Sequence, residues 1–177
     1  MERLAEFVIV PAGPGDAAAL AEVHVRAWRE TYRGLLPELY LERMSAAQHA
    51  QRWRRQLTRA RPGDVVLAAE GPREVAGYCA GAIVGGTEAE VFTLYLLKAA
   101  QGCGLGRRLL EMTSRALLAQ GAKSLRLWVL NGNEKAMGFY AHLGGVAVSE
   151  RPSPGWSGAL RETAFRWSDI RALAAAA

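Results

Sequence analysis

The segment of residues 99–112, AAQGCGLGRRLLEM, constrains the fold of this chain more than any other. An apolar run ends just before it, and three glycines at alternate positions are followed by a helical pattern. From Leu105 onward, apolar residues recur at positions 105, 109, 112 and 116, which is typical of a helix with one buried face. A second apolar run, SLRLWVL, follows at residues 124–130. The unit from Glu90 to Leu130 therefore predicts a strand, a helix and a second strand joined by a parallel crossover.

The rest of the chain predicts short elements on either side of this unit. An apolar run at its start and three before Leu97 predict strands, and the gaps between those three are short enough for antiparallel hairpins. Helical patterns lie between the first strand and this group, where we expect Asp16 and Ser45 to cap two of the helices. Another helix and two strands close the chain. The expected fold is α/β with α+β character, in one domain over residues 1–168, with a frayed tail at 169–177.

Composition narrows the class of protein. The chain has 177 residues, half of them hydrophobic, which suits one folded domain. No apolar run approaches the roughly 20 residues needed to span a bilayer, so we expect a cytoplasmic protein without a membrane partner. Cys79 and Cys103 stand alone and the histidines lie far apart, which predicts neither a disulfide nor a metal site. The net charge of +5 permits a nucleic-acid partner, but the basic residues are interleaved with acids, so we expect none.

The glycine segment has the chemistry of an anion site. The first turn of a helix has unpaired N–H groups and the positive end of the helix dipole, and glycine lets an anion approach them closely. Arg107 and Arg108 add positive charge beside it. A dinucleotide fingerprint would need glycine at Arg107, and a phosphate loop would need Gly-Lys followed by Ser or Thr. Both of these familiar motifs are therefore excluded.

A third motif fits. Residues 101–106, QGCGLG, match the Q/R-x-x-G-x-G/A signature of the GNAT superfamily of N-acetyltransferases, which the chain closely resembles. Upstream, EVFTLYLL resembles the central strand of that family. Downstream, LRLWVLNGNEKAMGFYAHLGG resembles its next motif, and the N-terminal helices resemble those of many bacterial members. The resemblance covers about residues 7–168. It implies a GNAT-type mixed, mostly antiparallel sheet of about seven strands, with helices on both faces and a central pair of strands that splay apart.

The resemblance also implies acetyl-CoA as co-substrate, without a metal. The amides of Gly102 to Arg107 would hold the pyrophosphate, the strand backbone at 94–96 would pair with the pantetheine arm, and Asn133 would contact that arm while also suiting the cap of its helix. The residues expected to bind the cofactor are Leu94, Tyr95, Leu96, Gln101, Gly102, Cys103, Gly104, Leu105, Gly106, Arg107 and Asn133.

Two catalytic roles follow from the same resemblance. Tyr140, seven residues after Asn133, would be the general acid that protonates the departing thiolate. An acceptor amine must lose a proton before it attacks, so a carboxylate is expected as base. Glu90 is the first candidate and Glu88 the second, although an acid beside a strand also suits a solvated turn. Some family members place the base on the next strand, where this chain has Trp128 instead.

The expected activity is transfer of an acetyl group from acetyl-CoA to a primary amine by direct attack. The acceptor is a small-molecule or peptide amine, and Trp28 and Tyr32 either line its pocket or belong to the core. The protein is expected to be a monomer or a homodimer. One alternative is a non-catalytic sensor that binds acyl-CoA on the same fold. A nucleic-acid-associated basic protein is the weakest alternative.

Overall fold

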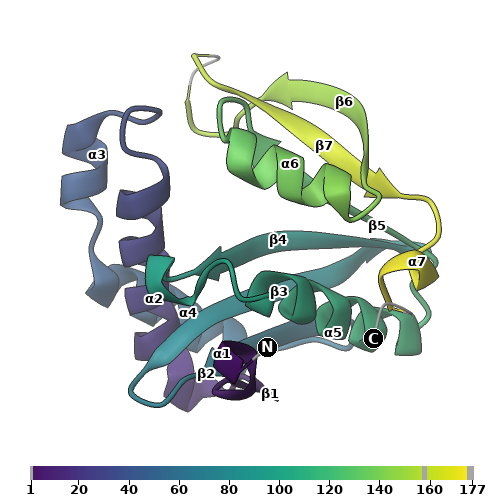
Figure 1. Ribbon diagram of the computed structural model, residues 1–177, viewed down its shortest axis with the longest axis horizontal. Helices are drawn as coiled ribbons and strands as arrows, with labels where there is room; N and C mark the ends of the chain where they lie inside the picture. The colour runs from purple at the N-terminus through teal and green to yellow at the C-terminus, as the bar shows by residue number, and fades with distance from the viewer. Residues whose placement is uncertain (1, 157–158, 175–177) are drawn as a thin grey trace.

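A seven-stranded sheet in the order β1-β2-β3-β4-β5-β7-β6 organises the protein (Figure 1). The computed structural model describes residues 2–156 and 159–174. The strands are β1 (Val8–Pro11), β2 (Asp64–Glu70), β3 (Val75–Gly85), β4 (Glu88–Leu96), β5 (Ser124–Leu130), β6 (Val146–Pro152) and β7 (Arg161–Trp167). The α-helices are α1 (Glu2–Ala5), α2 (Ala17–Thr31), α3 (Glu38–Arg43), α4 (Ala46–Thr58), α5 (Leu105–Ala119), α6 (Glu134–His142) and α7 (Arg171–Ala174). Two 3₁₀ turns are η1 (Pro14–Asp16) and η2 (Lys98–Ala100).

Strand pairing confirms the expected mixed sheet. Between the described strands every neighbouring pair is antiparallel except β4 and β5, which α5 joins as a parallel crossover. The hairpins β2–β3 and β3–β4 are also as expected. No helix in residues 2–156 or 159–174 is long and apolar enough to cross a membrane.

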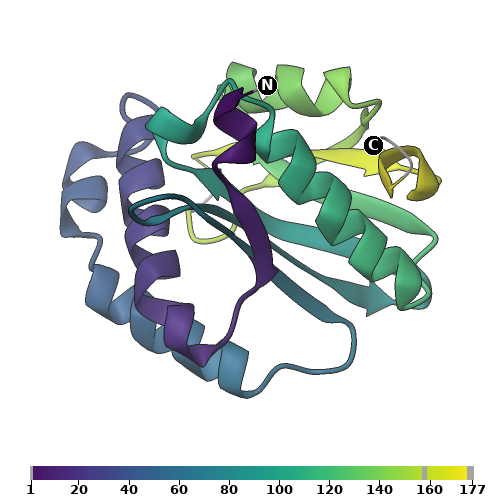
Figure 2. The ribbon, with the colours of Figure 1, turned by 60° about the horizontal axis from the view of Figure 1, so that its bottom comes forward.

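Helices cover both faces of the sheet (Figures 1 and 2). Because side chains alternate along a strand, neighbouring residues of β3 enter different cores: Cys79 packs with α5, while Tyr78 packs with α2 and α4. On α5, Leu105 and Leu109 are buried in the first of these cores. The sheet is therefore packed on both faces, and β4 is its middle strand.

The central strands part halfway along. Pairing of β4 with β5 runs only from Glu88–Ser124 to Val91–Leu127. On its other side, β4 shifts register against β3 between Val91 and Thr93, so Phe92 forms a bulge. A bulge bends a strand and increases its twist. The expected splay is therefore confirmed, and it begins where β4 bends.

Two details of the chain ends and caps differ from expectation. Asp16 precedes α2, but its carboxylate accepts the N–H of Gly13 at 2.7 Å instead of capping that helix. Ser45 caps α4 as expected, accepting from the Gln48 amide at 3.3 Å. The tail does not fray over residues 170–174, where Leu173 is buried as α7 packs on α5. Residues 175–177 lie outside the described part of the chain.

His24 of α2 is half-buried and contacts the sheet. His24 Nδ1 lies 2.8 Å from the Tyr78 hydroxyl, and its ring stacks on that of His49 at 4.3 Å between centroids. Burial, with the positive charge of His49 and Arg52 nearby, lowers the pKa of His24 to about 3. Burial raises the pKa of Tyr78, so Tyr78 donates to a neutral imidazole. The native state therefore holds His24 unprotonated.

This histidine predicts a pH-dependent stability. In the unfolded chain His24 takes up a proton below about pH 6.5, whereas in the native state it does so only near pH 3. Above pH 6.5 this difference in pKa does not change the free energy of unfolding. Below pH 6.5 it lowers that free energy by about 1.4 kcal/mol per pH unit, so that the loss at pH 5 is about 2 kcal/mol. Denaturant unfolding of the wild type and of His24→Phe at several pH values measures this. The difference in free energy of unfolding should shrink as the pH falls from 7 to 5; a constant difference would contradict the assignment.

Candidate active site

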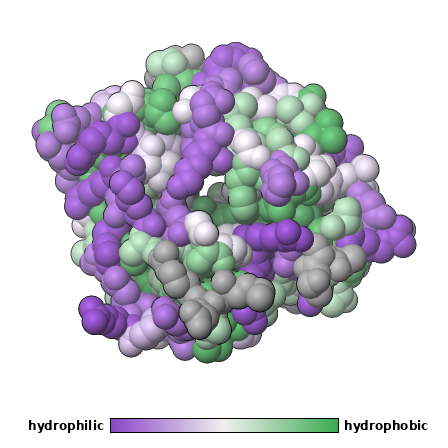
Figure 3. Space-filling model, viewed as in Figure 1, coloured by the Kyte–Doolittle hydropathy of each residue, from purple (hydrophilic) through white to green (hydrophobic). Residues whose placement is uncertain are grey.

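A cleft of about 620 Å³ opens where β4 and β5 part. One wall is the second half of β4, the other is α6, and the glycine segment forms one end. The surface is hollowed near its centre in the view of Figure 3. The splay thus produces a cavity bordered by strand backbone on one side and by a helix on the other.

Glycine occupies the three positions of the segment for different structural reasons. Gly102 (φ +77°) and Gly104 (φ +90°) have left-handed backbone conformations that side chains disfavour, and Gly104 is the N-cap of α5. Gly106 has ordinary helical geometry, and a Cβ there would lie 3.5 Å from Leu96 and 3.6 Å from Phe139, which is normal contact. Neither backbone strain nor the chain's own packing requires glycine at 106. Its missing side chain leaves free space in the cleft beside the α5 N-terminus, as close approach of an anion requires.

The cleft-facing backbone of β4 is available for pairing. Leu97 donates its N–H to Ala76 of β3, and successive residues of a strand direct their backbone groups to opposite sides. Leu94 and Leu96 therefore direct theirs into the cleft, where the Leu96 carbonyl accepts from the Gln101 side chain at 3.1 Å. Tyr95, expected with them, directs its backbone toward β3 and lines the cleft with its side chain.

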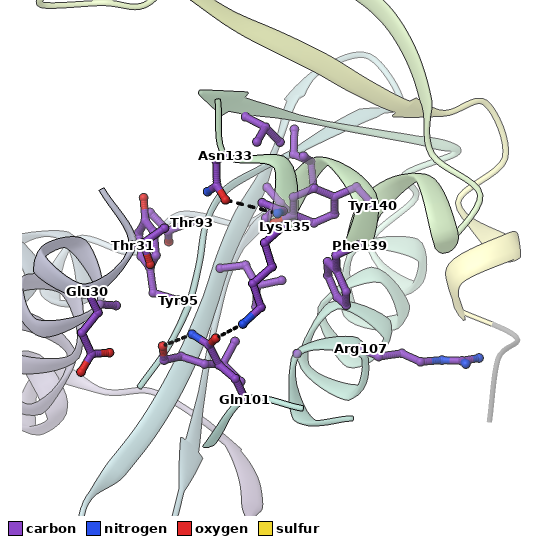
Figure 4. Close-up of a pocket in the computed structure, with 18 of the residues that line it drawn as sticks. Glu30, Thr31, Thr93, Tyr95, Gln101, Arg107, Asn133, Lys135, Phe139 and Tyr140 are labelled. Atoms are coloured by element: carbon purple, nitrogen blue, oxygen red, sulfur yellow. Dashed lines mark hydrogen bonds between the residues drawn. The ribbon is translucent and has the colours of Figure 1, made fainter. Parts of the chain in front are cut away.

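A polar bridge joins the glycine segment to α6. Gln101 accepts a hydrogen bond from Lys135 Nζ at 2.5 Å while donating to Leu96, as Figure 4 shows. At the start of α6, Asn133 accepts from the Ala136 amide at 3.2 Å, so it is the helix cap as well as part of the cleft wall. Lys135 was missed in the sequence analysis, because its partner lies 34 residues away along the chain.

The side chains of the remaining motif residues contact other parts of the protein. Leu105 is 1% exposed in the core, and the Cys103 thiol donates to the Ala100 carbonyl at 3.2 Å. The Arg107 side chain points away from the cleft (Figure 4) and pairs with Glu111. These three side chains therefore have their contacts within the protein itself. Within the described residues, no cluster of three or more His, Cys, Asp or Glu could hold a metal ion.

Tyr140 extends from α6 into the space beside β4 (Figure 4). Its ring is 8% exposed and packs between Phe139 and Phe165, at centroid distances of 5.1 and 6.1 Å. Burial, with smaller effects from Cys79 and Tyr32, raises the pKa of the phenol. Because the pKa lies above its ordinary value of 10, the hydroxyl stays protonated at neutral pH and suits a proton donor.

A second pocket of about 260 Å³ adjoins the cleft. Tyr32, Tyr95 and Trp128 are among the residues that line both cavities. Trp28 lines the second pocket and packs on Tyr32 at 5.0 Å between centroids. Burial raises the pKa of Tyr32, opposed by Tyr95 and Asn133, which lie within hydrogen-bonding reach of its hydroxyl. Trp28 and Tyr32 thus line the pocket and also pack in a small core on α2.

Glu90 lines the second pocket, where its carboxylate is already engaged. Arg126 of β5 donates to it at 2.7 Å and lies 3.1 Å from Glu88. Glu88 also lies 3.5 Å from Arg166 of β7. Glu90 therefore lines the second pocket, where Arg126 holds its carboxylate in place.

The cleft between the parted strands, with the N-terminus of α5 at one end, suits a ligand that carries a phosphate. Residues 23–145 match the acetyltransferase (GNAT) family, and the chain belongs to this family. It is thus an acetyl-CoA-dependent N-acetyltransferase. It is 30% identical over 162 residues to the uncharacterized N-acetyltransferase YuaI of Bacillus subtilis (strain 168), covering 89% of this chain and 91% of YuaI.

Solved structures share the fold. PaiA N-acetyltransferase from Thermoplasma acidophilum, in complex with coenzyme A, aligns with a TM-score of 0.72 at 21% identity, over 90% of this chain and 97% of that one. YncA from Salmonella typhimurium, solved with acetyl-CoA, aligns with a TM-score of 0.67 at 19% identity, over 93% and 94%. The expected GNAT-type architecture is therefore confirmed.

Proposed function

We propose that the protein acetylates a primary amine, which enters through the second pocket while acetyl-CoA occupies the cleft between β4 and β5. The observation that carries this proposal is the junction of the two cavities at Tyr32, Tyr95 and Trp128. A thioester in one cavity and an amine in the other would meet there, and holding reactants together removes much of the entropic barrier.

Different residues of the cleft bind different parts of acetyl-CoA. The amides of the glycine segment and the N-terminus of α5 hold the pyrophosphate. The backbone groups of Leu94 and Leu96 pair with the pantetheine arm as with an added strand, opposite Asn133 on α6. The free space at Gly106 fits this assignment, because a side chain there would occupy it.

The residues near the junction move the protons. Acetyl-CoA supplies the activated acetyl group. Tyr140 donates its hydroxyl proton to the departing sulfur. Because burial raises the pKa of the phenol, the hydroxyl is protonated at neutral pH. Glu90 stays the candidate to receive the amine's proton, directly or through water, since it lines the pocket by which the amine arrives. The monomeric or dimeric state and the cytoplasmic location stay predictions.

Release of free thiol from acetyl-CoA, followed across a panel of primary amines, tests this function. We expect turnover with at least one amine and a product acetylated on nitrogen. Tight acetyl-CoA binding without turnover of any amine would support the sensor alternative instead. Loss of turnover in Glu90→Gln but not in Glu88→Gln would support Glu90 as base.

Lys135 provides a test of the pyrophosphate site. Its ammonium lies at the cleft mouth, held by Gln101, and would contact the pyrophosphate as a charged donor. Lys135→Met should weaken coenzyme A binding by about tenfold, since hydrogen bonds to charged groups contribute about 1.5–3 kcal/mol. It should also make binding less sensitive to salt. The control is Lys123→Met, outside both cavities; equal affinities of the two variants, measured by calorimetry, would exclude Lys135 from the site.

A further inference from the structure

The acidic groups of the second pocket already have donors. Glu90 is paired with Arg126, as described above. Glu162 of β7 is only 12% exposed, accepts from Arg151 Nε, and lies 3.4 Å from the Ser153 hydroxyl. Each carboxylate therefore already accepts a hydrogen bond from an arginine.

The basic side chain of the pocket, Arg151, is held in place but retains nitrogens that can donate further hydrogen bonds. The Arg151 guanidinium lies over the Trp128 ring, with its central carbon 3.8 Å from the ring centroid. Its Nε is bound to Glu162, and its terminal nitrogens make no hydrogen bond to any described residue. Trp128 Nε1 is also buried without a hydrogen-bond partner in the described chain. Among the described residues that line this pocket, the buried side-chain atoms without a partner are Trp28 Nε1 and Trp128 Nε1, which are N–H donors like the terminal nitrogens of Arg151, whose side chain is 43% exposed.

This arrangement selects the charge of the ligand. An ammonium ion binds well over the face of a tryptophan, but Arg151 already covers Trp128. A guanidinium fixed by stacking and by an ion pair at Nε leaves its outer edge as a rigid fork for an oxyanion. The pocket volume of about 260 Å³ lies below the usual range for drug-sized ligands, so the occupant is small.

We propose that the acceptor is an α-amino acid, whose carboxylate binds the terminal nitrogens of Arg151 while its amine reaches the junction with the cleft. This inference rests on the proposed function and specifies its substrate. Trp128 lines both cavities, so a carboxylate on Arg151 lies beside a side chain that also borders the cleft. A decarboxylated amine leaves the Arg151 fork unpaired.

Matched acceptors test this inference. For phenylalanine and for methionine, kcat/KM is measured by thiol release with the amino acid, its carboxamide and its decarboxylated amine. The amino acid should exceed both analogues by about tenfold or more, the loss expected for one or two charge-assisted hydrogen bonds. Equal or better use of the decarboxylated amines would overturn the inference and leave the proposed function intact. Turnover of no compound in any set would overturn both.

Variants of two arginines on the β6–β7 pair distinguish binding of the substrate carboxylate from a purely structural role. Arg151→Met should bring the ratio of kcat/KM for amino acid over amine close to one, mainly through KM. Arg161→Met, which removes an exposed ion pair with Glu150 outside the pocket, should leave the ratio unchanged. Arg151→Lys, which retains the charge for Glu162 but not the fork, serves if the methionine variant does not fold, and should lose most of the preference. An unchanged ratio in a folded Arg151 variant would contradict the assignment.

Discussion

Replacing Tyr140 with phenylalanine should lower kcat by about 100-fold or more, the range of general acid catalysis, while acetyl-CoA affinity changes little. The substitution removes only the hydroxyl and keeps the ring that packs against Phe139 and Phe165. Because burial raises the pKa of this phenol, the wild-type enzyme should show no loss of kcat from its ionisation below about pH 10. Steady-state kinetics over a pH series measures both effects.

Tyr78→Phe is the matched control. Tyr78 is fully buried beside β4, outside both cavities, and its hydroxyl binds His24. Its loss should reduce the free energy of unfolding by about 1 kcal/mol and leave kcat within a few fold. Equal kcat values for wild type and Tyr140→Phe would remove Tyr140 from the role of acid.

Gly106→Ala should stabilise the protein and weaken its binding of coenzyme A. Alanine favours a helix over glycine by up to about 1 kcal/mol, and its Cβ has room in the described structure. The same methyl group occupies the space through which an anion reaches the α5 amides. Loss of one or two hydrogen bonds to the pyrophosphate corresponds to about 10- to 100-fold weaker binding. Thermal unfolding and calorimetric titration measure the two effects.

Gly138→Ala in α6 separates the two effects. Gly138 also has helical geometry with open space around its Cβ position, but it lies outside the cleft lining. This variant should gain stability and bind coenzyme A as the wild type does. If both variants bind coenzyme A with wild-type affinity, the claim that an anion approaches the α5 amides beside Gly106 is contradicted. Gly104 is less suited to this test, because its positive φ would strain any side chain.

Local patterns in the sequence predicted the local parts of the site. The glycine turn, the Asn133 cap and the strand–helix–strand unit each depend on residues close together in the chain. The splay could not be deduced from hydrophobic periodicity and came from the family resemblance. Its physical origin is the bulge at Phe92, which depends on how β4 registers against β3. No pattern within β4 alone specifies that register.

Pairs that are distant in sequence were missed or misjudged. The engagement of Glu90 follows from the parallel register that sets it beside Arg126, 36 residues later. The position of Arg151 over Trp128 and the bridge from Gln101 to Lys135 likewise join different elements. Asp16 shows the same limit at short range, because Gly13 competes with the helix for its carboxylate. Sequence therefore predicted the elements around the cleft and left the second pocket undefined.

Residue-resolved amide hydrogen exchange, with and without saturating acetyl-CoA, tests the central claim that the thioester binds between β4 and β5. The account predicts slower exchange at the cleft-facing amides of Leu94 and Leu96 and across residues 102–107, because these groups gain hydrogen bonds on binding. Exchange in β6, which lines no part of the cleft, should stay the same. Unchanged exchange at Leu94, Leu96 and 102–107 in the presence of bound acetyl-CoA would place the cofactor elsewhere and contradict the account.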